Sequence, residues 1–185
     1  MIQLLSHKSY LQMPWMNKNG VTSQILIEPA IANLKLLDFE YRLSSAPITG
    51  NTVFSKFPNY QRILITIKGK GFSLNGAVFE TLEPAFFSGD EETLCELIDG
   101  NIVDLGLIYN PKTILANIKI VKFEKTFCMH KEDSSIYIIY LLRGACKVNE
   151  IAGIENDSII ITDSESLFFQ CSKKAEFVLI QIKRI

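Results

Sequence analysis

The stretch "ILITIKGKGFSLNG" (63–76) decides the fold, because a second stretch, "IYIIYLLRGACKVNE" (136–150), follows the same plan. Each has an apolar strand, then a glycine, Gly69 or Gly144, and then a second strand. The two glycines lie 75 residues apart in a chain of 185 residues. Two copies of one jelly-roll-like unit would produce this spacing, although any two β-hairpins share some of these features.

Alternating apolar and polar residues recur along the rest of the chain. In "FEYRLSS" (39–45), Phe39, Tyr41 and Leu43 share one face, and Arg42 lies on the other. No window of 11 or more residues shows helical periodicity, and turn signals separate the runs, so the sequence predicts an all-β sandwich or barrel. The further predicted strands are 22–27, 62–68, 102–109, 118–127, 136–142, 158–162 and 177–183.

The composition limits the partners and the compartment. Hydrophobic residues make up 48% of the chain, which excludes a disordered protein. The formal net charge of −1 argues against nucleic acid or an anionic membrane as the main partner. The N-terminus lacks the basic start and apolar run of a leader, and no run of 18 apolar residues occurs. We therefore expect a cytoplasmic protein that neither spans nor binds a membrane.

No segment rich in proline, glycine or serine divides the chain. We expect a single compact domain over 1–185, with approximate halves 1–110 and 111–185 and no linker between them. The four cysteines form no CxxC pair, and without an export signal they are expected to be reduced thiols and not two disulfides. The oligomeric state, including a homodimer, stays open.

Several kinds of catalytic and metal chemistry have no sequence support. His7 and His130 are the only histidines, and no HxH or HExxH motif is present, so we expect no metal and no cofactor. The chain also lacks GxSxG, a P-loop and a GxGxxG that follows a strand. The carboxylates of residues 90–92 lie at a turn, where charge runs are usually solvated.

Two polar clusters lie next to predicted strands, where a barrel would open to solvent. In residues 15–22, Asn17 fits either a tight turn or a ligand contact through its amide. In "FSKFPNYQR" (54–62), the pair Phe57-Pro58 fixes an extended bend, and Arg62 begins the next strand. An arginine beside aromatic walls is suited to carboxylate recognition, and an exposed salt bridge is the equal alternative.

Two charged residues within strands raise a related question. If Arg42 faces the barrel interior, it is a buried charge that needs a partner, and if it faces outward it is an ordinary surface residue. Asp104 lies between apolar neighbours in "NIVDLGLIY" and needs a partner if it is buried. An ion pair of Asp104 with Arg42 or Arg62 is the simplest structural explanation.

These clusters resemble motifs of the HutD/Ves family. "MPWMNKNGVTSQI" (13–25) is similar to W-K-N-G-G-G-x-T-x-E-I, "FEYRLSSAPI" (39–48) to F-x-W-R-x-S-x-A-x-V, and "FSKFPNYQR" (54–62) to F-S-x-F-P-G-x-D-R. "FFSGD" (86–90) and "GNIVDLGLIY" (100–109) resemble F-x-G-D and G-x-x-x-D-L-N-x-M. The order and spacing of the five motifs agree over about residues 13–109.

The resemblance implies a cupin-like fold, an RmlC-like jelly roll, with two β-barrel units in one chain. It also implies a metal-free pocket for a small carboxylate metabolite and a modulating role in histidine utilisation or the stress response. The implied ligand-binding residues are Trp15, Asn17, Thr22, Arg42, Ser55, Phe57, Arg62 and Asp104.

This chain departs from the family pattern at six positions. Met16 replaces a lysine, Lys18 and Asn19 replace two glycines, and Gln24 replaces a glutamate. Gln61 stands where an aspartate precedes the arginine, and Gly106 stands where asparagine is usual. Any altered ligand specificity is expected at Met16, Lys18, Asn19 and Gln24.

Three functions fit the sequence. The first is a metal-independent protein that binds a small carboxylate. The second is a metal-independent isomerase or hydrolase, in which Asp104 or Asp90 is the general base and Tyr41 or Tyr109 the acid. The third is a structural or interaction module in which the same residues only tie loops down.

Overall fold

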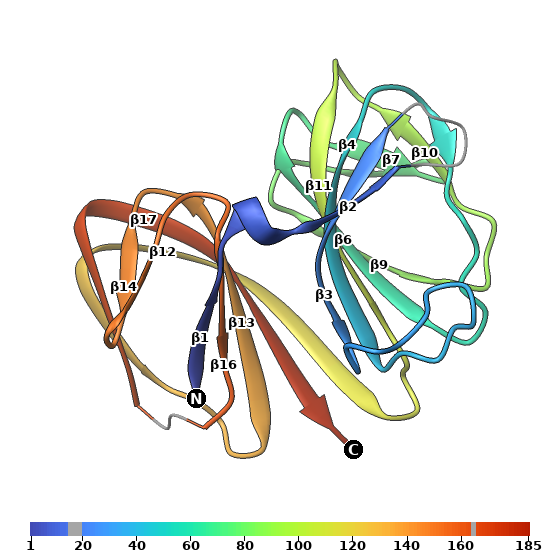
Figure 1. Ribbon diagram of the computed structural model, residues 1–185. Coiled ribbons are helices and arrows are strands. Elements are labelled where there is room, and N and C mark those ends of the chain that lie inside the picture. The colour runs from blue at the N-terminus through green and yellow to red at the C-terminus, as the bar shows by residue number, and fades with distance from the viewer. Residues whose placement is uncertain (15–19, 164–165) are drawn as a thin grey trace. The chain divides into compact units, whose positions relative to one another are not determined.

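The computed structural model describes residues 1–14, 20–163 and 166–185 (Figure 1). In this part of the chain, regular structure consists of β-strands and one short 3-10 helix, His7–Ser9. The predicted all-β class is confirmed, and it follows from short runs of β-branched and aromatic residues between turns. The strands form two compact units, which are described separately.

The first unit comprises Leu11–Thr113. One sheet has the strand order β2-β3-β4-β11-β6-β9, and a smaller sheet has the order β5-β10-β7-β8. The neighbouring strands within each sheet pair antiparallel. The strands are β2 (Leu11–Pro14), β3 (Val21–Glu28), β4 (Tyr41–Ile48), β5 (Thr52–Val53), β6 (Gln61–Lys68), β7 (Phe72–Leu74), β8 (Ala77–Phe79), β9 (Pro84–Ser88), β10 (Leu94–Leu97) and β11 (Ile102–Tyr109).

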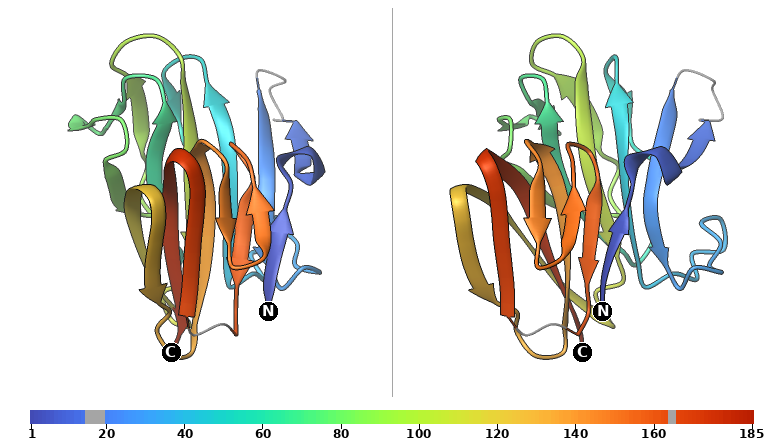
Figure 2. Two further views of the ribbon diagram at one scale, coloured as in Figure 1. Left: turned by 90° about the vertical axis from the view of Figure 1, so that its left-hand side faces the viewer. Right: turned by 60° about the vertical axis from the view of Figure 1, so that its left-hand side comes forward.

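The second unit comprises Met1–Tyr10 and Ile114–Ile185. Its sheet has the order β1-β16-β13-β17-β14-β15, and β12 pairs with β17 over most of its length, as both views of Figure 2 show. The strands are β1 (Ile2–Leu5), β12 (Ile114–His130), β13 (Ser135–Arg143), β14 (Cys146–Val148), β15 (Ile151–Gly153), β16 (Ser158–Ile161) and β17 (Ser166–Arg184).

The division between the units differs from the predicted halves at the N-terminus. The boundary expected near residue 110 lies at Thr113, but the first ten residues belong with the C-terminal half of the chain. The reason is a strand pairing, because β1 lies antiparallel to β16 and extends its sheet. A pairing between residues so far apart in sequence leaves no local signal in the sequence.

The strand pairing contains the predicted repeat. In both units a long strand, β6 or β13, leads into a short hairpin, β7–β8 or β14–β15, and then into β9 or β16. Strands β9 and β16 return to pair with the long strand. The pairing β11–β6 has a bulge that skips Ile67, and β17–β13 has one that skips Leu142, which also lies 75 residues further on. The two units therefore share the same strand plan, including the position of this bulge.

Each unit buries its own apolar core. In the first unit the core contains Phe72 and Cys95, both with no exposed surface. In the second unit, the rings of Phe169 and Phe177 stack with centroids 5.2 Å apart, and Phe123 packs edge-on against both. Burying aromatic rings supplies much of the free energy that holds such small barrels together.

The repeated glycine is required by backbone geometry. Gly69 has φ +106° and Gly144 has φ +79°, a region that side chains disfavour. A Cβ atom at Gly69 would lie 2.8 Å from the Asn101 carbonyl oxygen, and one at Gly144 would lie 2.5 Å from that of Lys174. These glycines allow the chain to turn sharply between the long strand and the short hairpin.

Replacing Gly69 by alanine should destabilise the protein more than the same change at Gly76. Both have positive φ, but a Cβ at Gly76 would meet nothing within 4 Å. We expect Gly76→Ala to cost about 1 kcal/mol of unfolding free energy and Gly69→Ala about 3 kcal/mol, measured by denaturant unfolding. Equal losses would show that backbone conformation alone, and not the close approach of Asn101, requires Gly69.

Candidate functional site

The candidate site lies on one face of the larger sheet in the first unit. Strand β11 pairs with β4 on one side and with β6 on the other, which places Arg42 and Arg62 both directly opposite Ile108. Asp104 lies on the same face, four residues before Ile108, because side chains alternate along a strand. This face carries core residues such as Leu64 and therefore forms the inside of the unit.

Arg42 is a buried charge with neutral partners. Its side chain is 5% exposed, and it donates to Gln24 Oε1 at 2.8 Å and to Ser44 Oγ at 3.2 Å. Met13 Sδ lies 3.7 Å from its remaining nitrogen. Burial lowers the pKa of Arg42 to about 10, and the nearby Asp104 partly offsets this effect. The predicted alternative of an outward Arg42 on the surface is wrong, because both faces of β4 are buried.

Arg62 lies among three aromatic rings. Its guanidinium carbon is 4.9 Å from the ring centroid of Phe54, 5.5 Å from that of Phe57 and 4.8 Å from that of Phe87. One nitrogen donates to the backbone carbonyl of Ser55 at 3.2 Å. Cation–π contacts stabilise the charge, and the guanidinium has further N–H donors besides the one that binds Ser55. Burial lowers the pKa of Arg62 to about 10.

Asp104 is a buried carboxyl group near both arginines. It is 8% exposed, and its Oδ1 accepts a hydrogen bond from the Ala46 amide at 2.8 Å. Burial raises its pKa to about 7, while the amide and the two arginines oppose the rise. Thr66 on β6 lies directly opposite Asp104 on β11, and its hydroxyl is buried without a hydrogen-bond partner.

The predicted ion pair of Asp104 with an arginine is wrong. Among the residues that the structure describes, no ion pair within 4.0 Å joins Asp104 to Arg42 or Arg62. The arginines influence the carboxyl group from a greater distance. Since a carboxyl group with a pKa near 7 is only partly ionised at neutral pH, the two guanidinium groups leave an excess of positive charge inside the unit.

Gly106 leaves the middle of this face without a side chain. It lies between Asp104 and Ile108 on β11, with Ser44 and Leu64 opposite it. A Cβ atom added at Gly106 would have only one neighbour within 4 Å, Leu64 Cδ1 at 3.3 Å. The departure from the family asparagine therefore removes a polar side chain from the space between the charged groups.

The other predicted site residues differ in how they relate to the two arginines. Thr22 lies on β3, two residues before Gln24 and on the same face. Ser55 contributes its backbone carbonyl, and Phe57 contributes its ring, both to Arg62. Trp15 and Asn17 lie outside the described residues.

The residues proposed for catalysis are not brought together. Tyr41 and Tyr109 lie opposite each other on β4 and β11, on the face of the sheet that points away from Asp104. Asp90 accepts a hydrogen bond from the Asn59 amide at 2.9 Å, and its neighbour Gly89 accepts one from the Phe57 amide at 2.7 Å. Asp90 and Gly89 thus hold the segment that precedes Arg62.

Sequence reasoning missed five contacts of the arginines, those with Gln24, Ser44, Met13, Phe54 and Phe87. In the sequence Gln24 stands out only as a departure from the family pattern, yet it accepts the shortest hydrogen bond of Arg42. Its position two residues after Thr22 in an alternating strand was the available signal. Met13, Phe54 and Phe87 had no comparable signal, because their contacts depend on the strand pairing.

The histidines are used elsewhere. His7 lies 2.7 Å from a carboxylate oxygen of Asp157, and His130 lies 3.3 Å from the Ser166 hydroxyl. Within residues 1–14, 20–163 and 166–185, no group of three or more histidine, cysteine, aspartate or glutamate side chains could hold a metal ion. Over the same residues, no helix is long and apolar enough to cross a membrane.

Comparison with known proteins agrees with the motifs. The HutD family matches residues 7–179. The chain belongs to the HutD family. A 21.2 kDa protein in the hutC 3′ region of Pseudomonas putida is 34% identical over 142 residues, which cover 74% of this chain and 72% of that protein. Protein Ves of Citrobacter koseri is 27% identical over 142 residues, which cover 74% of this chain and 70% of Ves.

Solved structures support the fold of this HutD-family chain. HutD from Pseudomonas fluorescens SBW25 has a TM-score of 0.83 and 25% identity, with 100% of both chains covered. A bacterial pirin from Escherichia coli, solved with nickel(II), has a TM-score of 0.70 at 9% identity and covers 98% of each chain. A cupin 2 barrel protein from Leptotrichia buccalis has a TM-score of 0.56 at 11% identity and covers 98% of this chain and 96% of the other. The predicted cupin-like fold is confirmed.

The buried carboxyl group predicts how stability depends on pH. Because the pKa of Asp104 is about 7 in the folded chain and near 3.8 without burial, the folded state holds a proton that the unfolded state releases between these values. Its contribution to the unfolding free energy should therefore fall as pH rises from 4 to about 7, by an amount on the order of 4 kcal/mol.

Asp104→Asn should remove this part of the pH dependence. Asparagine keeps an oxygen that can accept from the Ala46 amide and carries no charge. Denaturant unfolding at pH 5 and pH 8 should show the variant gaining stability relative to wild type at the higher pH. The exposed Asp133→Asn is the control, and a parallel pH profile for wild type and Asp104→Asn would contradict the assignment.

Proposed function

We propose that the Leu11–Thr113 unit binds a small carboxylate, without a metal, between Arg42 and Arg62. The observation that carries the proposal is that two guanidinium groups face the inside of one barrel and neither forms an ion pair with a described carboxylate. Arg42 is buried and Arg62 is half-buried. Charges removed from water without a counter-charge are costly, and an anionic ligand would relieve that cost.

The surroundings of the arginines favour a small, flat ligand. Three rings crowd the guanidinium of Arg62, and a carboxylate group is small and planar enough to accept two parallel hydrogen bonds from such a group. Gly106 places no side chain beside these donors, at a point where a Cβ would already lie 3.3 Å from Leu64 Cδ1. A carboxylate of a few heavy atoms fits this arrangement better than a large metabolite does.

Two relatives support the choice of ligands. The structure of HutD from P. fluorescens was solved in a formate condition. The P. putida relative is named for its place in the hutC 3′ region. We therefore extend the proposal to formate and to carboxylate intermediates of histidine breakdown, with a modulating role for this protein in the cytoplasm.

Binding should be visible as thermal stabilisation that depends on Arg62. A carboxylate at 100 times its dissociation constant adds about 2.7 kcal/mol, or roughly 5–10 °C in Tm for a chain of this length. We expect this shift with wild type and little or none with Arg62→Ala, measured by calorimetry with formate, acetate and urocanate.

Lys56→Ala is the matched control, because Lys56 is an exposed cation in the same segment as Phe57. It should respond to carboxylates as wild type does. If none of the carboxylates shifts wild type, or if each shifts wild type and Arg62→Ala equally, this binding function is ruled out.

Carboxylate binding should weaken as pH rises through 7. An ionised Asp104 repels an anion held by the neighbouring arginines, whereas the protonated form does not. Titration calorimetry should therefore show tighter binding at pH 6 than at pH 8 in wild type. Asp104→Asn should bind equally well at both values, and an unchanged pH dependence in this variant would exclude Asp104 as the cause.

A second candidate function is proton transfer by Asp104 to or from a bound ligand. The pKa of about 7 favours it, because such a group can both accept and release a proton near neutral pH. Under this alternative, Asp104→Asn still binds the carboxylate. It no longer catalyses the exchange of the carbon-bound protons of the ligand with D2O, which NMR follows. Absence of exchange with wild type would leave binding as the function.

A further inference from the structure

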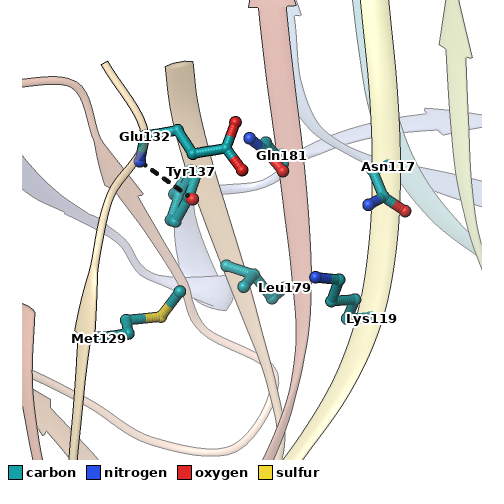
Figure 3. Close-up of a pocket in the computed structure, with 7 residues that line it drawn as sticks. All are labelled: Asn117, Lys119, Met129, Glu132, Tyr137, Leu179 and Gln181. Atoms are coloured by element: carbon teal, nitrogen blue, oxygen red, sulfur yellow. Dashed lines mark hydrogen bonds between the residues drawn. The ribbon is translucent and has the colours of Figure 1, made fainter. Parts of the chain in front are cut away.

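The second unit has its own polar cavity. It has a volume of about 40 Å³ and lies between β12, β13, β17 and the connection that follows β12 (Figure 3). This exceeds the space that one water molecule needs, about 10–15 Å³, and is far below the 300 Å³ of a typical drug-sized pocket. Its lining includes Asn117, Lys119, Glu132, Tyr137, Leu179 and Gln181.

This cavity occupies the position that the repeat makes equivalent to the arginine site. Gln181 on β17 lies directly opposite Asn117 on β12 and Tyr137 on β13. In the first unit, the row on the corresponding strands is Arg42, Ile108 and Arg62. Asn117 follows Arg42, and Tyr137 follows Arg62, by the same 75 residues that separate the two turn glycines. One position of the fold therefore carries a polar row in both units, with different chemistry.

Several lining groups have hydrogen-bonding capacity left over. The Asn117 oxygen accepts from the Ile118 amide at 2.8 Å, so its NH2 group is available. Gln181 donates to the Ser135 hydroxyl at 3.3 Å, which leaves its oxygen as an acceptor. Tyr137 accepts from the Glu132 amide at 3.2 Å and keeps its own proton to donate. Among the described residues, these remaining groups have no partner.

Opposite charges reach the cavity from two elements. In Figure 3, the Glu132 carboxylate extends from the connection after β12, and the Lys119 side chain extends from β12 itself. Within the described chain the two do not form an ion pair. Leu179, which is 6% exposed, provides an apolar surface in the same cavity.

We propose that this cavity is a second ligand site, which takes the zwitterionic group of a small amino acid. The carboxylate of the ligand binds Lys119 and the Asn117 NH2 group, and its ammonium group binds Glu132 and the Gln181 oxygen. The volume takes part of the zwitterionic group, and the rest of the ligand extends through the open side. The site belongs to the other unit and does not depend on carboxylate binding by Arg42 and Arg62.

Glycine is the probe, with acetate and methylamine as its two half-ligands. In 15N NMR spectra of the full chain, glycine should shift the side-chain NH2 signals of Asn117 and Gln181 and reach saturation. Acetate and methylamine should each bind roughly tenfold or more weakly, because each satisfies only one of the two charges.

Variants separate this site from the remainder of the protein. Lys119→Ala and Glu132→Gln should each weaken glycine binding roughly tenfold or more. Two exposed residues outside the cavity provide matched controls, Lys173→Ala and Glu124→Gln, and Arg62→Ala should bind glycine as wild type does. All the substituted side chains lie at the surface of this unit or in the other unit, so each variant is expected to fold. A well-dispersed 15N NMR spectrum of each variant verifies this.

Three results would overturn the proposal. The first is no saturable shift of the two amide signals with glycine. The second is binding of acetate alone as tightly as glycine, which would make the cavity a simple anion site. The third is unchanged glycine binding by both Lys119→Ala and Glu132→Gln.

Discussion

The pairing of β11 with both β4 and β6 is the constraint on which the site depends. Because side chains alternate along each strand, the register that joins Ile108 to Arg42 and to Arg62 also selects every other residue that faces inward. A shift of one residue would turn both arginines and Asp104 to the opposite face. The apolar residues on the same strands hold the register in place, so the core and the site are specified together.

Low polarity inside the barrel explains the electrostatics of all three groups. Burial disfavours charge, which lowers the pKa of Arg42 and Arg62 and raises that of Asp104. An ion pair would have relieved both effects, but the arginines use Gln24, Ser44, a backbone carbonyl and aromatic rings instead. The interior is left with positive charge and a carboxyl group that titrates near neutral pH, an arrangement suited to an anion whose binding responds to pH.

The repeat shows how one fold can carry two different chemistries. The units share the turn glycine, the short hairpin and the bulge, all of which are backbone features. They differ in the side chains on the equivalent row, which are Arg42, Ile108 and Arg62 in one unit and Asn117, Gln181 and Tyr137 in the other. Strand pairing thus fixes the location of a polar row, and the side chains decide what it can bind.

The sequence by itself determined the class of fold, the repeat and most of the strands. Period-2 patterns and glycine turns are local consequences of backbone geometry, and they are readable without the structure. The family motifs also singled out Arg42, Arg62 and Asp104. Only the tertiary structure decided that both faces of β4 are buried, that Asp104 stands apart from the arginines, and that residues 1–10 join the second unit. These outcomes depend on pairings between distant strands and on distances between side chains, and neither leaves a periodic signal along the chain.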